Sequence, residues 1–225
     1  MLDLLLPRRC LVCARGGTLL CPACRAGLPG LTPPLCRRCG APTAWPVGRC
    51  RECAGRRLAF ADARAAVAYV DGVRPLVAAW KERGLRRLAR EAAEIVAERL
   101  PPPPGEILTF VPADGARRLE RGFHPAELLA RELGRAWGLP CEPLLRRSGA
   151  SRRQRGLPLA ERRRNVARAF EARAGPAGRV LLVDDVYTSG ATANAAASAL
   201  RRGGALEVGV VTFARTVRAP RMRLQ

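Results

Sequence analysis

The sequence predicts an α/β protein in which helices flank a parallel sheet and a small cysteine-rich segment precedes it. Eight of the nine cysteines lie before residue 54. After residue 60 the chain alternates β-branched apolar runs with Ala- and Leu-rich stretches of helical periodicity. The run 179–192 combines an apolar strand, two acids, a loop of small residues and a helix start. Strands that alternate with helices favour parallel pairing through crossover connections.

The cysteine-rich segment contains four Cys-x-x-Cys pairs. Each pair can present two thiolates to one ion, so four pairs suffice for two tetrahedral zinc sites. The candidate ligands are Cys10, Cys13, Cys21, Cys24, Cys36, Cys39, Cys50 and Cys53. No histidine or acid accompanies them as an open-site ligand, which indicates structural zinc. Sequential pairing is the simplest arrangement because short loops close at the least entropic cost, and an interleaved arrangement stays open.

Disulfides are the alternative, and a reducing cytosol disfavours them. A thioredoxin-like redox role would place one such pair in a βαβ unit rather than four in a Pro- and Gly-rich segment. The composition changes after Cys53, so the sequence predicts a ribbon domain at 1–57 and an α/β domain at 58–225. Cys141 stands apart, and we expect an ordinary buried thiol there.

The charge balance is strongly basic, with 40 Lys and Arg against 19 Asp and Glu and a net charge of +21. Such a charge attracts polyanions, nucleic acid and phosphorylated metabolites among them. Lys81 is the single lysine, and a skew to arginine alongside abundant Ala, Gly and Pro also arises in a GC-rich genome. The charge therefore leaves a nucleic-acid partner open, and Lys81 with the arginines around it is expected on a solvated face.

No segment supplies the roughly 18 apolar residues of a membrane span. Leu2 to Leu6 is also too short and interrupted for a signal-peptide core. We therefore expect a cytoplasmic protein without a membrane span.

The expected elements follow from apolar spacing and from the positions of glycine and proline. They are a strand at 63–70, helices from Pro75 to Pro101 with a break at Gly84, a strand at 107–111, a helix at 126–137, a strand, loop and helix within 179–202, and a strand at 208–213. In parallel sheets ligands bind beyond the carboxyl ends of the strands, and the loops after 111 and 183 both lie there.

The second of these loops has the composition of a sugar-phosphate site. Asp184 and Asp185 can hold ribose hydroxyls or a hydrated Mg²⁺, while small residues let backbone N–H groups close on an anion at a helix start. The candidate phosphate ligands are Thr188, Ser189, Gly190, Ala191 and Thr192. An acidic surface turn is the alternative, but such a turn rarely needs two acids followed by five small residues.

This stretch closely resembles the ribose-5-phosphate loop of type I phosphoribosyltransferases, which use phosphoribosyl pyrophosphate (PRPP). The resemblance implies that Asp184 and Asp185 contact the ribose hydroxyls, partly through Mg²⁺, and that loop 188–192 holds the phosphate. Purine-salvage members carry an Asp where this chain has Thr188, so a hypoxanthine- or guanine-type reaction is placed in doubt.

The loop after Val111-Pro112 resembles one branch of that superfamily, the ComF competence proteins, which also carry an N-terminal cysteine-knuckle segment. The resemblance rests on Arg-Arg-Leu-x-x-Arg-Gly-Phe and implies a pyrophosphate side formed by Arg117, Arg118 and Arg121. Two departures stand out. His124 replaces an expected Asn, and Ala113-Asp114 replaces a more apolar and basic run, where the Asp repels pyrophosphate unless it binds metal.

Two functions follow from the resemblance. One is a Mg²⁺-dependent phosphoribosyltransferase that acts on an unidentified acceptor; the other is a DNA-uptake factor in natural transformation, with PRPP as a regulatory ligand and single-stranded DNA and a competence helicase as partners. No catalytic residue is assigned, since His124 is better explained as a capping or packing residue. The Arg-rich segment 146–164 could close over phosphates, contact a DNA backbone or be a solvated loop.

Overall fold

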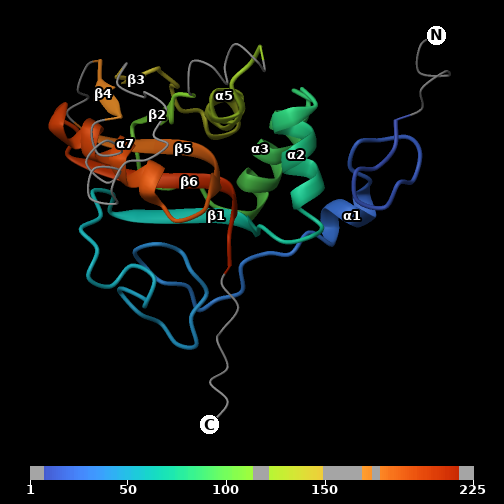
Figure 1. Cartoon of the computed structure of the whole chain (residues 1–225), viewed down its shortest axis with the longest axis horizontal. Helices are drawn as coiled ribbons and strands as arrows, with labels where there is room; N and C mark the ends of the chain where they lie inside the picture. Colours follow the sequence, from blue (N-terminus) through green and yellow to red (C-terminus); the bar gives the residue numbers. More distant parts are fainter. Residues whose placement is uncertain (1–7, 114–121, 149–168, 174–177, 218–225) are drawn as a thin grey trace, which may run out of the picture.

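The described part of the chain forms one parallel sheet with helices on both faces (Figure 1). The structure is a computed structural model, and it describes residues 8–113, 122–148, 169–173 and 178–217. The sheet has the order β1-β6-β5-β2, with every pairing parallel. Its strands are β1 Asp62–Ala68, β2 Ile107–Phe110, β5 Arg179–Tyr187 and β6 Glu207–Arg215. The predicted parallel sheet is confirmed.

Within the described residues, four helices accompany the sheet. They are α2 Arg74–Glu82, α3 Leu88–Arg99, α5 Pro125–Trp137 and α7 Ala191–Arg202. Proline at the start of α2 and α5 fits the first helical turn, where its missing N–H costs no hydrogen bond. Gly84 separates α2 from α3 with a φ of 69°, a left-handed conformation that other residues rarely adopt. The expected break at Gly84 is therefore confirmed.

Alternate residues of β5 enter two separate cores. Leu181 and Val183 pack into the core with α2, α3 and α5, while Val180 and Leu182 pack into the core with α7. This alternation follows from the two-residue repeat of a strand, whose successive side chains point to opposite faces. Each fully buried aliphatic side chain contributes about 1.5–3 kcal/mol, so a strand that is apolar on both faces is held firmly at the centre.

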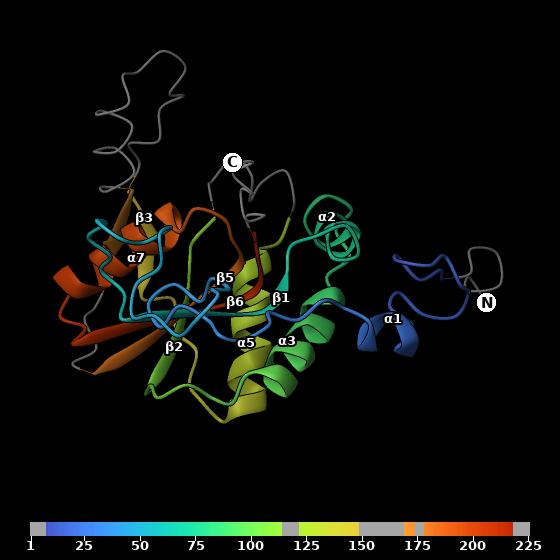
Figure 2. The ribbon, with the colours of Figure 1, turned by 90° about the horizontal axis from the view of Figure 1, so that it is seen from below.

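The cysteine-rich segment forms two ribbons that lie at different places on the α/β unit (Figures 1 and 2). The first ribbon, residues 8–28, includes helix α1 Pro22–Ala26 and adds buried residues to the core of α2 and α3. The second ribbon, residues 35–57, adds buried residues to the core of α7. Because each ribbon shares a core with the sheet, the division at residue 57 remains a prediction.

A short antiparallel pair lies outside the main sheet. It consists of β3 Leu145–Arg147 and β4 Phe170–Ala172, which the sequence did not predict. These strands flank residues 149–168, which are outside the described part. Of the helices described, none combines the length and the apolar character needed to traverse a bilayer.

Candidate functional site

A pocket of about 570 Å³ lies where α2 and the connections that follow β2 and β5 meet. Residues from separate parts of the chain line it: Tyr69, Val77, Lys81, Glu82, Pro112, Ala113, His124, Arg147, Asp184, Asp185, Thr188 and Thr192. The carboxyl ends of parallel strands meet at one edge of the sheet, which explains why these segments converge. The acid pair and both ends of the predicted phosphate loop thus border the same cavity.

The acid pair lies within β5 rather than just beyond its end. β5 continues to Tyr187, whereas β2 stops at Phe110, which lies opposite Val183. Asp184 and Asp185 therefore emerge where the neighbouring strand has ended, and they face the pocket. The sequence-based expectation was that the strand ended before the acids; the strand is longer because β6 continues to pair with β5 past them.

The environment of Asp184 disfavours its charged form. Burial raises the pKa of Asp184 to about 8, the neighbouring Asp185 charge adds to this, and Lys81 and Arg147 oppose it. Because this folded-state pKa exceeds the usual value, the folded state holds a proton that the unfolded chain releases, and stability falls as pH rises from about 4 to about 8. A bound cation would relieve this cost by compensating the negative charge.

Lys81 contacts the acid pair directly. Its Nζ lies 2.7 Å from Oδ1 of Asp185, and the side chains are 25% and 13% exposed. The expectation of a solvated face was wrong for this residue, because the last turn of α2 lies against the pocket. The neighbouring Arg83 is exposed as expected. The sequence offered one sign of a special role for Lys81, since it is the single lysine in an arginine-rich chain.

Loop 188–192 has the backbone geometry of an anion-binding turn. Gly190 has a φ of 71°, and a Cβ at this position would lie 2.1 Å from the Tyr187 hydroxyl, so only glycine fits. It occupies the N-cap of α7, and as a glycine it has no side chain with which to cap the helix. The first-turn N–H groups of a twelve-residue helix are therefore directed at the loop, and the helix dipole favours an anion there.

The individual loop residues differ in where they lie. Thr188 and Thr192 line the pocket, while Ser189 and Ala191 are exposed beside it. The Ser189 hydroxyl accepts a hydrogen bond from the Ala191 N–H at 3.3 Å. The structure thus brings two of the predicted phosphate ligands to the cavity and places the other three in the turn between them.

The predicted pyrophosphate residues Arg117, Arg118 and Arg121 lie outside the described residues. Within the described part, Arg147 of β3 lines the pocket. Its Nε donates to the Pro112 carbonyl oxygen at 3.3 Å, and its guanidinium lies 5.1 Å from the Phe170 ring centroid. Sequence reasoning had placed Arg147 only within an arginine-rich segment, because the antiparallel pair that positions it was not predicted.

His124 lies at the N-cap of α5 and lines the pocket, but its side chain does not cap the helix. Its ring packs edge-on against Phe110 at 5.4 Å, and its Nδ1 lies 3.8 Å from Oε2 of Glu127. The expected packing role fits these contacts, while the expected cap is absent. Cys141 is half-buried, and burial raises the pKa of its thiol.

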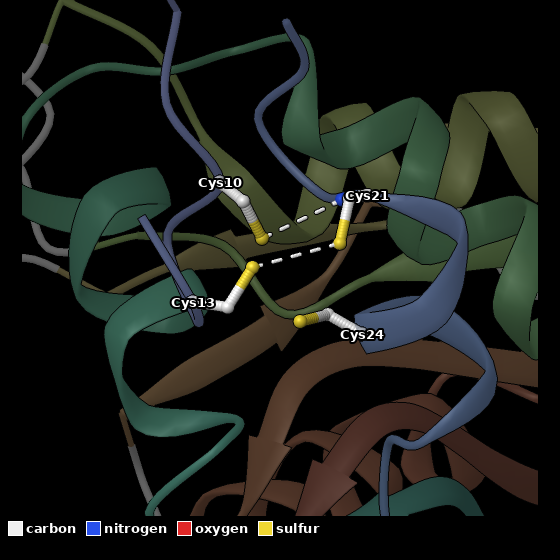
Figure 3. A group of neighbouring side chains, drawn as sticks. All are labelled: Cys10, Cys13, Cys21 and Cys24. Carbon is white, nitrogen blue, oxygen red and sulfur yellow. Dashed lines mark hydrogen bonds between the residues drawn. The ribbon is translucent and has the colours of Figure 1, made fainter. Parts of the chain in front are cut away.

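The cysteines of each ribbon converge in sequential order. In the first ribbon the sulfur atoms of Cys10, Cys13, Cys21 and Cys24 lie within 4.8 Å of one another (Figure 3). Cys36, Cys39, Cys50 and Cys53 form the second cluster under the same limit. Sequential pairing is therefore confirmed.

The sulfur separations suit a tetrahedral metal. The Sγ atoms of Cys13 and Cys21 lie 3.7 Å apart, and those of Cys39 and Cys50 lie 3.4 Å apart. Four thiolates at about 2.3 Å from zinc are separated by about 3.8 Å along each tetrahedral edge. A disulfide would require about 2.05 Å, so these separations favour zinc.

Backbone hydrogen bonds stabilise the ionised form of one cysteine in each cluster. The Cys21 N–H donates to Sγ of Cys10 at 3.5 Å (Figure 3). In the second cluster the Cys50 N–H donates to Sγ of Cys36 at 3.2 Å. Burial opposes ionisation, but backbone N–H groups outweigh it and lower the pKa of Cys10 to about 6 and that of Cys36 to about 7. Thiolates held in this way are ready metal ligands.

The second ribbon also contacts the phosphate loop. Nη1 of Arg56 donates to the Ser189 carbonyl oxygen at 2.8 Å. The adjoining Ala59 N–H donates at 2.7 Å to Oδ1 of Asn194 in the first turn of α7. Two hydrogen bonds thus connect the end of this ribbon to the loop and to the helix that follows it.

A buried arginine strengthens this connection. Arg215, at the end of β6, is 1% exposed; it donates to the Cys39 carbonyl oxygen and, at 3.0 Å, to Oε2 of Glu52. Its guanidinium also lies 5.0 Å from the ring centroid of Tyr187, whose hydroxyl lies against Gly190. The second cysteine cluster and the phosphate loop therefore share one set of contacts.

Comparisons with known proteins agree with this architecture. Residues 1–54 match the double zinc ribbon domain, and residues 119–223 match the phosphoribosyl transferase domain. Competence protein F of Haemophilus influenzae is 29% identical over 229 residues, which cover 92% of this chain and 96% of that protein. Competence protein ComFC of Bacillus subtilis is 26% identical, with 88% and 84% covered.

A third relative matches about half of the chain. The DNA utilization protein YhgH of Escherichia coli O157:H7 is 36% identical over 118 residues, which cover 51% of each protein. The sheet, the loop after β5 and the two cysteine clusters define a phosphoribosyltransferase-fold protein with a double zinc ribbon. Within that class, the chain is similar over most of its length to two competence proteins of the ComF type.

Proposed function

We propose that this protein binds PRPP or a related phosphoribosyl ligand together with Mg²⁺ and acts in natural transformation, in the uptake of DNA. The observation that carries the proposal is the single pocket bordered by Asp184, Asp185 and loop 188–192. The names of the relatives, two competence proteins and a DNA utilization protein, support the cellular role.

The site residues fit a magnesium-bound sugar phosphate. Mg²⁺ prefers hard oxygen ligands and is commonly held by one or two carboxylates together with phosphate oxygens. Asp184 and Asp185 would hold the ion, which would supply positive charge to offset the negative charge of the ligand. The N-terminus of α7 would hold the 5′-phosphate, and Arg147 would supply positive charge on the side of β3.

The two cysteine clusters would each bind one structural Zn²⁺. All four sulfurs of each cluster are protein ligands, which leaves no open position for substrate or water. This proposal places the protein in the cytoplasm, where thiols stay reduced and available to zinc.

An active transferase is the second candidate for the same pocket. Tyr69, Val77 and Ala78 give the cavity an apolar wall on the α2 side, a surface that an acceptor base could contact. In that reaction the acceptor would attack C1 of the ribose as pyrophosphate leaves, and the protein would contribute positioning and charge stabilisation.

Single-stranded DNA and a competence helicase belong to the proposal as partners. The net charge of +21 suits contacts with a phosphate backbone, and such binding should weaken steeply with salt. In the second ribbon Trp45 is 68% exposed, close in sequence to exposed Arg37 and Arg49. An exposed aromatic among arginines is a surface on which an unpaired base can stack.

Calorimetric titration with PRPP tests the ligand assignment. We expect Mg²⁺-dependent binding to the parent and a loss of about hundredfold in the double variant Asp184→Asn/Asp185→Asn, since two charged ligands are removed. The affinity of the double variant for ribose-5-phosphate should fall less than its affinity for PRPP, because the phosphate of ribose-5-phosphate would contact the loop at 188–192. Equal PRPP affinity in parent and variant would show that the assignment is wrong. A screen for pyrophosphate release with different acceptors then separates ligand binding from catalytic turnover.

A further inference from the structure

We propose that Lys81 is an exchangeable counter-ion of the acid pair. In the ligand-free protein its ammonium group neutralises Asp185; when Mg²⁺ and the phosphoribosyl ligand enter together, it releases Asp185 to the metal and turns to the phosphate oxygens of the ligand. This inference rests on the proposed function and adds a residue that positions metal and ligand at that site.

The contact between Lys81 and Asp185 occupies the position that a metal needs. The Nζ–Oδ1 distance of 2.7 Å is that of a close, charge-assisted hydrogen bond. A carboxylate oxygen engaged by an ammonium group at this distance is not free to coordinate a divalent cation. Lys81 and Mg²⁺ therefore compete for Asp185. Mg²⁺ can bind this carboxylate only after it displaces the ammonium group of Lys81.

The choice of lysine matters because every other basic residue except the single histidine is arginine. Arginine binds a carboxylate through a planar fork of several donors, whereas lysine is a point charge on a flexible four-carbon stem. Elsewhere in this chain arginine–carboxylate pairs fix structure, as Arg215 with Glu52 and Arg25 with Glu91 do. Lys81, which lies beside the acid pair, is therefore of the residue type that can exchange its carboxylate partner.

The position of Lys81 suits a movement toward the ligand. It lies in the last turn of α2, and Val77 and Ala78 of the same helix also line the pocket. Thr188 and Thr192 border the same cavity, so an anion held by the phosphate loop shares the pocket with the ammonium group. Once Mg²⁺ takes Asp185, the negative charge of the ligand in the same pocket offers Lys81 a new partner.

The exchange makes metal and ligand binding depend on each other. Mg²⁺ alone would leave a displaced ammonium group without a partner in a partly buried site, which is costly. The ligand alone would have to draw Lys81 away from Asp185, which would leave that carboxylate unpaired beside the negative charge of the ligand. When both bind, each charge has a partner, so metal and ligand should bind with positive coupling.

The first test uses Mn²⁺ alone, titrated into zinc-loaded, full-length protein without phosphoribosyl ligand and followed by calorimetry. We expect Lys81→Gln to bind Mn²⁺ about tenfold more tightly than the parent, because the competing cation is gone. Lys81→Arg should bind it more weakly than the parent, because the fork holds Asp185. Arg83→Gln, an exposed change of equal charge two residues along, should not alter Mn²⁺ affinity.

The second test adds PRPP at saturating Mg²⁺. Here Lys81→Gln should bind PRPP about tenfold more weakly than the parent, since the contact with the phosphates is lost. Opposite signs in the two titrations identify an exchange, because a variant that merely disturbed the fold would weaken both. The melting temperature of each variant checks the fold independently.

Unchanged or weaker Mn²⁺ binding in Lys81→Gln would overturn the inference, and so would Mn²⁺ binding that is absent from both proteins. If the parent bound no PRPP but Lys81→Gln still gained Mn²⁺ affinity, the proposed function would fail while the counter-ion role at Asp185 would stand.

Discussion

The two ribbons carry the same four-cysteine motif but contact the molecule in different ways. The first ribbon meets α3 through a few buried residues and a partly exposed cluster of charges, in which Arg25 pairs with Glu91, Glu94 and Glu98. The second ribbon meets the α/β unit through Arg215, a guanidinium with almost no exposure, and through Arg56 at the phosphate loop. The same cysteine motif thus packs beside a helix in one place and contacts the candidate ligand site in another.

This difference matters because exposed and buried ion pairs contribute differently to the free energy of unfolding. An exposed pair contributes about 0–1 kcal/mol, whereas removing one partner of a buried pair costs about 3–5 kcal/mol. The Arg25 network is partly exposed, with its carboxylates 39–61% accessible. We therefore expect the first ribbon to separate from the sheet more easily than the second.

The largest effect should come from removing zinc ligands one ribbon at a time. Cys36→Ser/Cys39→Ser should lower ribose-5-phosphate affinity by about hundredfold, because structural zinc supplies on the order of 10 kcal/mol to a ribbon that supports the phosphate loop. Cys10→Ser/Cys13→Ser should leave that affinity within about twofold, since its ribbon packs on α3. Metal analysis should show one zinc lost in each case; equal losses of affinity would refute the distinction.

An effect on stability rather than on affinity should follow from Arg215→Met, which removes the buried guanidinium and leaves Glu52 without this partner. We expect the free energy of unfolding to fall by about 3–5 kcal/mol, measured by denaturant titration. Arg90→Met is the matched control, because Arg90 is 78% exposed in a pair four residues apart on α3 and should cost within about 0.5 kcal/mol. A similar cost for both variants would show that Arg215 is not a buried anchor.

The smallest effect should come from Arg56→Gln, which removes one hydrogen bond to the phosphate loop. We expect ribose-5-phosphate affinity to fall by about fivefold, in line with about 1 kcal/mol for a partly exposed hydrogen bond. Zinc content should not change. Arg57→Gln removes the neighbouring exposed arginine and should leave affinity unaltered; a drop in that variant as well would point to a general charge effect.

The sequence predicted the features that local patterns determine. Apolar periodicity located the main strands and helices, and loop-closure entropy favoured the sequential cysteine pairing that the structure has. The loop at 188–192 was recognisable because Gly190 and its small neighbours are required by backbone geometry. Each of these signals lies within a short stretch of chain.

Features that depend on distant residues escaped prediction. Lys81 was assigned to a solvated face because nothing near it in sequence indicates Asp185 as its partner. The strands β3 and β4 have three residues each, too few to show a period. The contact of Arg215 with the Cys39 carbonyl joins residues that are 176 positions apart in the sequence, so no local pattern predicts it.

The same separation has a consequence for synthesis of the chain. At about 5–20 residues per second, the ribosome adds Arg215 roughly 9–35 s after Cys39, whereas Arg99, which donates to the Leu28 carbonyl, follows Leu28 by 71 residues and emerges in roughly 4–14 s. The first ribbon can therefore settle on α3 early in translation. The second cannot close over the buried Cys39 carbonyl until β6 is made, so the contacts that support the loop at 188–192 are completed only after Arg215 has been added.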